Sequence, residues 1–92
     1  MGRETVLFKS EEKKSAADIA QTLRLIADKV EAGTMTLKQG ASDVQVDFPG
    51  TMTLELKVEE EQGKHRLKKS FEIELEWVPG EAAGDTGGAT IL

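Results

Sequence analysis

Between Thr34 and Trp77 the chain alternates apolar and polar residues with few interruptions. A period of two is typical of strands that have one dry face and one solvated face. The pattern therefore predicts an antiparallel sheet in which a single face is apolar. The positions that form this face are Met35, Leu37, Val44, Val46, Met52, Leu54, Leu56, Val58, Leu67, Phe71, Ile73, Leu75 and Trp77.

A helix is predicted for Ala16–Ala32, where apolar residues recur at spacings of three and four. Ser15 is a favourable N-cap, and Asp18 stands where a side chain can bond back to the N–H of the cap. Gly33 supplies the left-handed residue that commonly ends a helix. We expect the helix to cover the sheet with its apolar stripe, which consists of Ala16, Ile19, Ala20, Leu23, Ile26, Ala27 and Val30.

Turn residues and side-chain parity predict a register for the four strands that follow the helix. A two-residue loop at 39–40 places Met35 opposite Val44 and keeps the apolar residues on one face. A three-residue connection at 48–50 then joins the second of these strands to the third. A two-residue loop there would turn one apolar set to the wrong face.

The last hairpin is predicted in the same way. A two-residue loop at 62–63 places Leu54 opposite Phe71 on the apolar face. The same register places Glu59 opposite Arg66 on the solvated face. Side-chain parity and charge therefore favour the same register for this hairpin.

The segment Thr5–Lys9 is short, β-branched and aromatic, and it predicts a first strand. Its pairing is open between the second and the fifth strand, with the fifth favoured because antiparallel pairs are commoner. The sequence thus predicts an α+β fold in the order β-α-β-β-β-β. In it, one amphipathic helix packs on one face of a mainly antiparallel five-stranded sheet.

The chain has 92 residues, of which 38% are hydrophobic and 32% are charged. This size suits one core, so we expect a single domain over residues 1–80. Residues 81–92 have too little apolar content to order themselves and are expected to form a disordered tail.

The formal net charge of -5 argues against nucleic acid and anionic membranes as partners, because both require excess positive potential. The absence of cysteine excludes disulfides, thiolate nucleophiles and Cys-based zinc sites. The segment 1–8 contains no apolar signal-peptide core, and no run is long enough to cross a membrane. We expect a cytoplasmic protein.

Three stretches of the chain resemble the amphi-Trp domain, a small prokaryotic family named for its amphipathic segments and a Trp near its C-terminal end. With the spacing between them they cover about residues 4–79. The resemblance implies a stand-alone domain of unknown function, with no catalytic residue, cofactor or partner to transfer. The stretches are Val6-Leu7-Phe8-Lys9-Ser10, Ile26-Ala27-Asp28-Lys29-Val30-Glu31-Ala32-Gly33 and Phe71-Glu72-Ile73-Glu74-Leu75-Glu76-Trp77.

His65 is the only histidine and lies on the apolar parity near the last turn. One histidine without cysteine does not build an ordinary zinc site, and no serine stands in a nucleophile-elbow motif. We therefore expect no enzyme activity, no metal and no cofactor. The glutamates of the sheet are interpreted as a solvated face.

Three other residues are candidate contacts to a partner or ligand. Lys69 falls on the apolar parity opposite Leu56, where a charge is unexpected unless it lies at a rim or anchors an anion. Trp77 either closes one end of the core or covers an interface. Leu25 lies off the helix stripe and is expected to be exposed.

The favoured hypothesis is a small non-catalytic interaction or structural module. It would bind a protein partner or itself, as a homodimer, through a sheet edge or the apolar rim near Trp77. The alternative is a domain that binds a small ligand or anion in a pocket between helix and sheet, lined by Lys69, His65 and Trp77.

Overall fold

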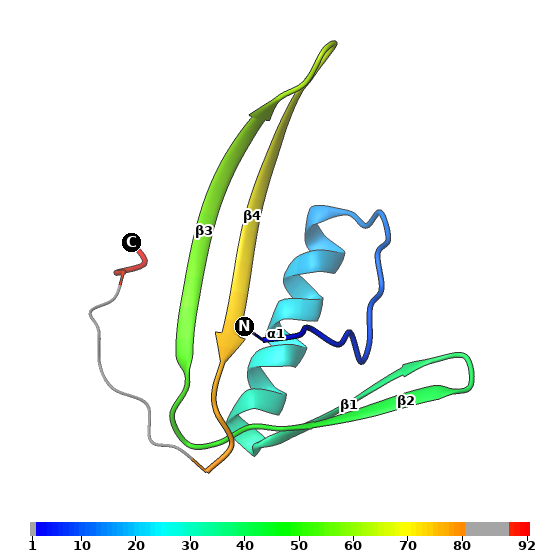
Figure 1. Cartoon of the computed structure of the whole chain (residues 1–92), viewed down its shortest axis with the longest axis vertical. Coiled ribbons are helices and arrows are strands. Elements are labelled where there is room, and N and C mark those ends of the chain that lie inside the picture. Colours follow the sequence, from blue (N-terminus) through cyan, green and yellow to red (C-terminus); the bar gives the residue numbers. More distant parts are fainter. Residues whose placement is uncertain (1, 81–88) are drawn as a thin grey trace. The chain divides into compact units, whose positions relative to one another are not determined.

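The computed structural model describes residues 2–80 and 89–92 (Figure 1). Its four strands form two separate antiparallel two-stranded sheets, β1–β2 and β3–β4. The chain divides into two compact units, Met1–Phe48 and Pro49–Leu92, and each is described by itself. The elements in chain order are α1 (Ala16–Ala32), β1 (Thr34–Gln39), β2 (Ser42–Asp47), β3 (Thr53–Gln62) and β4 (Leu67–Glu76).

Helix α1 has the predicted bounds and the predicted caps. The side-chain oxygen of Ser15 accepts a hydrogen bond from the backbone N–H of Asp18 at 3.1 Å. Gly33 adopts a left-handed conformation, with φ of 93°, and its N–H donates to the carbonyls of Lys29 and Val30. Each end of the helix therefore has a local cap.

The β1–β2 hairpin keeps the predicted parity but has a different register. Met35 lies opposite Val46, whereas the prediction placed it opposite Val44. Gln39 pairs with Ser42, so the two-residue loop consists of Gly40 and Ala41 and not of residues 39–40. Gly40 occupies the first loop position and has a positive φ of 59°. That position is where type II′ hairpin turns favour glycine.

The β3–β4 hairpin also keeps the predicted parity and changes its register. Leu54 lies opposite Leu75, and Val58 lies opposite Phe71, so the predicted pairing of Leu54 with Phe71 is wrong. The loop spans residues 63–66, and the Gly63 N–H donates to the Arg66 carbonyl at 2.9 Å. This longer loop moves each partner along the strand by four positions.

The α+β class is confirmed, but the five-stranded sheet is wrong. The predicted first strand, residues 5–9, has no regular structure, because a short β-branched segment forms a strand only where it finds an edge to pair with. The connection at 48–50 does not close a hairpin, since β2 pairs only with β1 in the described part of the chain. Part of the predicted tail, residues 81–88, lies outside the described residues.

Within residues 2–80 and 89–92, no side chain is buried. The apolar stripe of α1 is partly exposed, at 48% for Ile19 and 42% for Leu23, whereas Ile26 and Val30 are half-buried. Because the single five-stranded sheet is wrong, the prediction that the helix packs on one face of it is wrong as well.

Candidate interaction surface

The β3–β4 hairpin presents an apolar face whose side chains are largely accessible. Val58 and Phe71 lie opposite each other, with 76% and 61% of their surface exposed. Because successive residues of a strand point to opposite faces, the apolar side chains of both strands gather on one side. This apolar face consists of Leu54, Leu56, Val58, Leu67, Phe71, Ile73 and Leu75.

The opposite face of the hairpin is polar and mainly acidic. Its central cation is Lys57, whose ammonium lies 3.2 Å from Glu72 and 3.7 Å from Glu59. The hydrogen bond to Glu72, followed by the charge of Glu59, raises the pKa of Lys57 above its usual value. An open pocket of about 330 Å³ lies near this face, and it is lined by Glu59, Glu60, Glu61, Lys68, Ser70 and Glu72.

No group of three or more potential metal ligands occurs among the residues that the structure describes. Several of the acidic side chains have a cation beside them instead, since Lys57 lies next to Glu59 and Glu72 and Lys68 stands opposite Glu61. We interpret this surface as a solvated face.

Each strand of the hairpin has one edge that pairs with no other strand within the described residues. Such an edge carries backbone N–H and C=O groups that can bind another strand. The charges of β4 are also divided along its length. Lys68 and Lys69 lie near its start, and Glu72, Glu74 and Glu76 occupy its second half. The sequence predicts binding through a sheet edge but not which edge, although the charge division of β4 is visible in the sequence.

Lys69 lies on the apolar parity as predicted, but its neighbour differs from the prediction. It stands opposite Glu60 rather than Leu56, and the ammonium lies 3.2 Å from the Glu60 carboxylate. The Lys69 side chain is 70% exposed. The ion pair therefore interrupts the apolar face between Phe71 and Leu67, where the prediction allowed an anion-binding lysine.

The structure separates His65 from Trp77. His65 is exposed in the loop at 63–66, whereas the half-buried Trp77 follows the far end of β4. A strand of this length spans about 30 Å at roughly 3.3 Å per residue. The two side chains therefore do not converge with Lys69 on a single small ligand within this hairpin.

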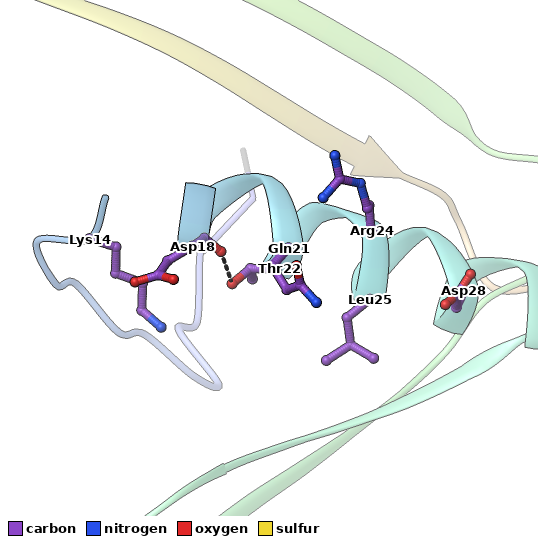
Figure 2. Close-up of a pocket in the computed structure, with 7 residues that line it drawn as sticks. All are labelled: Lys14, Asp18, Gln21, Thr22, Arg24, Leu25 and Asp28. Carbon is purple, nitrogen blue, oxygen red and sulfur yellow. Dashed lines mark hydrogen bonds between the residues drawn. The ribbon is translucent and has the colours of Figure 1, made fainter. Parts of the chain in front are cut away.

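Leu25 is exposed, as predicted, and lies in the other unit of the chain. It lines an open pocket of about 400 Å³ on α1, with both acidic and basic neighbours (Figure 2). Asp18 and Asp28 carry opposite charge to Lys14 and Arg24. This mixture gives the pocket no preference for an anion or a cation.

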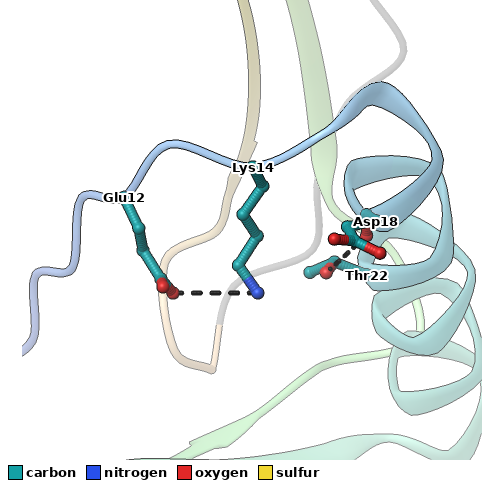
Figure 3. Close-up of polar contacts among 4 residues, drawn as sticks. All are labelled: Glu12, Lys14, Asp18 and Thr22. Carbon is teal, nitrogen blue, oxygen red and sulfur yellow. Dashed lines mark hydrogen bonds and ion pairs between the residues drawn. The ribbon is translucent and has the colours of Figure 1, made fainter.

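The polar groups at the start of α1 also have local partners (Figure 3). The Thr22 hydroxyl donates to the Asp18 carbonyl at 3.0 Å, and Lys14 lies 3.8 Å from Glu12. Local pairing of this kind is common on helix surfaces and indicates no ligand.

None of the helices in the described ranges is both long and apolar enough to cross a membrane. Comparison with curated proteins and with solved structures found no match. The family model described as Amphi-Trp domain matches residues 1–92, which is the whole length of this sequence. The chain therefore belongs to the Amphi-Trp domain family.

Proposed function

We propose that this chain is a small non-catalytic module that binds a protein through its β3–β4 hairpin. The observation that supports this proposal most directly is the exposure of Val58 and Phe71 at the centre of the apolar face. Soluble proteins rarely leave a continuous apolar patch uncovered unless it serves an interaction.

The energetics favour covering this face. Full burial of one Val, Leu, Ile or Phe side chain contributes about 1.5–3 kcal/mol. Five side chains of the apolar face are exposed. A partner that covered them would gain a fraction of this burial free energy from each side chain, because each is already partly covered. The exposed members are Leu54, Val58, Leu67, Phe71 and Ile73.

The proposal is tested by affinity capture with three tagged forms of the full chain. The wild type is compared with Val58→Ser, on the apolar face, and with Glu55→Ser, on the polar face of the same strand. Captured proteins are quantified by mass spectrometry, and an untagged copy of the chain is co-expressed so that self-association is measured separately. Far-UV circular dichroism of all three forms checks that the hairpin is retained.

We expect the wild type and Glu55→Ser to retain the same partner, and Val58→Ser to lose it. Equal retention by all three forms would overturn the proposal, because the apolar face would then contribute nothing. Failure of the wild type to retain any protein other than its own copy would overturn it as well.

A further inference from the structure

We infer that two copies of this chain join edge to edge along β4, about a two-fold axis at Phe71. This inference goes beyond the proposed function, because an edge contact leaves the apolar face of both copies open to the protein that binds there. The two hairpins would form one four-stranded antiparallel sheet in the order β3–β4–β4–β3. The apolar faces of both copies would lie on the same side of this sheet.

The division of charge along β4 supports an antiparallel contact between two copies. Lys68 lies in the first half of the strand, and Glu72 and Glu74 lie in the second half. A two-fold axis places the first half of one strand beside the second half of the other, because the same surface is used by both subunits. Basic residues then face acidic residues twice in each dimer.

The requirement for a common apolar face limits the possible registers. Phe71 and Leu75 must lie on the same side in both copies, so the two-fold axis must pass through a residue and not between two residues. Within β4 the central choices are Ser70, Phe71 and Glu72.

An axis at Phe71 gives the most favourable pairs of facing side chains. It places Lys68 opposite Glu74 and Ser70 opposite Glu72 of the second copy. On the apolar face it places Leu67 opposite Leu75, and Phe71 opposite its own copy. The paired segment then runs from 67 to 75 with no like charges opposite each other, which is the arrangement that cross-strand pairs favour.

The two neighbouring registers are less favourable. An axis at Glu72 would place this carboxylate directly opposite its own copy, and like charges in that position are destabilising. An axis at Ser70 would shorten the paired segment to residues 67–73 within β4 and place Lys69 opposite Phe71.

The outer strand β3 offers no comparable edge. It contains the four glutamates Glu55, Glu59, Glu60 and Glu61 but only one lysine, Lys57, so its charges are not divided into two opposite halves. Lys69 of β4, which would oppose Ile73 of the second copy, already has its charge paired with Glu60 of its own hairpin. Its aliphatic stem can therefore pack on Ile73.

The inference is tested by sedimentation equilibrium of the purified full chain and of two charge variants. Lys68→Glu and Glu74→Lys each convert two opposite-charge pairs per dimer into two like-charge pairs. Each is expected to weaken self-association roughly tenfold or more. An equimolar mixture of the two variants restores both pairs in the mixed dimer and is expected to recover the wild-type association.

Lys64→Glu is the matched control, because it makes the same charge change in the loop, outside the paired segment. It is expected to associate like the wild type. The inference is overturned if Lys68→Glu associates as tightly as this control, or if mixing the two variants restores nothing.

A second measurement uses the absence of cysteine from the chain. Oxidation of Phe71→Cys is expected to give covalent dimers, since the two-fold axis brings the two positions together. Oxidation of Val58→Cys is not expected to give covalent dimers, because the two β3 strands in the four-stranded sheet lie about 14 Å apart, at roughly 4.8 Å per strand. Disulfides require Cα atoms within about 7 Å. Equal cross-linking of both variants would overturn the edge contact.

The two proposals fail in different ways. A wild-type chain that stays monomeric at the highest soluble concentration overturns the inference of a second copy. The proposed function survives that result if another protein is still retained in a Val58-dependent manner. It fails only if no protein is retained through the apolar face.

Discussion

The ammonium of Lys69 lies 3.2 Å from the carboxylate of Glu60, directly across the β3–β4 hairpin. Both residues lie on the same side as Val58 and Phe71, because side chains two positions apart share a face. The ion pair therefore lies within the apolar face, between Phe71 and Leu67. It also places the charge of Lys69 beside an anion within its own hairpin.

Because this ion pair is solvent-exposed, we expect it to contribute little to folding. Lys69→Ala should lower the free energy of unfolding by about 0–1 kcal/mol, as measured by urea denaturation. Lys64→Ala, in the adjoining loop, is the control and should leave the unfolding curve unchanged. A loss of about 3 kcal/mol or more, the range for a broken buried pair, would contradict the exposed position of Lys69.

The N-cap of α1 should be a measurable contribution to stability. Ser15→Ala removes the acceptor of the Asp18 N–H and is expected to cost about 1 kcal/mol, within a range of about 0.5–2. Ser15→Asp retains an acceptor and should keep most of the stability. Circular dichroism during urea unfolding measures the loss, and Ser10→Ala, outside the helix, serves as control. Equal stability of Ser15→Ala and the wild type would contradict the cap.

The helix could be predicted in full because its signals are local. Ser15 and Gly33 each act through the backbone within one helical turn, and the structure shows both caps as predicted. The faces of the strands could also be predicted, since alternation depends only on the sequence of each strand. Val58 and Phe71, for example, do share a face.

The registers could not be obtained from alternation alone. Moving a hairpin partner by an even number of positions keeps every apolar residue on the same face, so Leu54 could oppose Phe71 or Leu75 equally well by parity. The charged residues do distinguish these two registers. The predicted register placed Lys69 opposite Leu56, whereas the observed one places it opposite Glu60. The opposite charges of Lys69 and Glu60 are visible in the sequence, but the two-residue turn predicted at 62–63 requires the other register.

The candidate surface was predictable only in part. The sequence marks Lys69 and Trp77 as single unusual residues, whereas the edge of β4 that is unpaired within the described residues depends on which strands pair. Pairing of distant segments is not determined by periodicity, and the predicted five-stranded sheet would have covered edges that pair with no other strand among residues 2–80 and 89–92.

Gly33 is expected to be sensitive to substitution for a reason confined to the backbone. Its φ of 93° lies in the left-handed region, and an added Cβ would meet no atom within 4 Å. Gly33→Ala should therefore lower the free energy of unfolding by about 1–2 kcal/mol through conformational cost alone. Gly50→Ala is the matched control, because its Cβ also meets nothing and its φ is not left-handed. Similar losses for both variants in urea denaturation would contradict this account.

Asp47 provides a prediction for the pH dependence of the β1–β2 hairpin. Its carboxylate accepts hydrogen bonds from the Gln45 amide at 2.9 Å and the Thr34 hydroxyl at 3.0 Å. These bonds favour the ionised form and lower the pKa of Asp47, with the Gln45 bond as the larger cause. A lowered pKa in the folded state means that Asp47 stabilises the hairpin above the ordinary aspartate pKa. This contribution is lost as the pH falls through the lower, folded value.

An NMR titration of the Asp47 carboxyl carbon measures this pKa directly. We expect Gln45→Ala to raise the pKa of Asp47 toward its ordinary value, and Thr34→Val to raise it by less, because the Gln45 bond is the larger of the two causes. Both variants remove one donor and leave the carboxylate in place. If neither substitution moves the titration of Asp47, the two hydrogen bonds do not hold its charge. If Thr34→Val has the larger effect, the ranking of the two bonds is wrong.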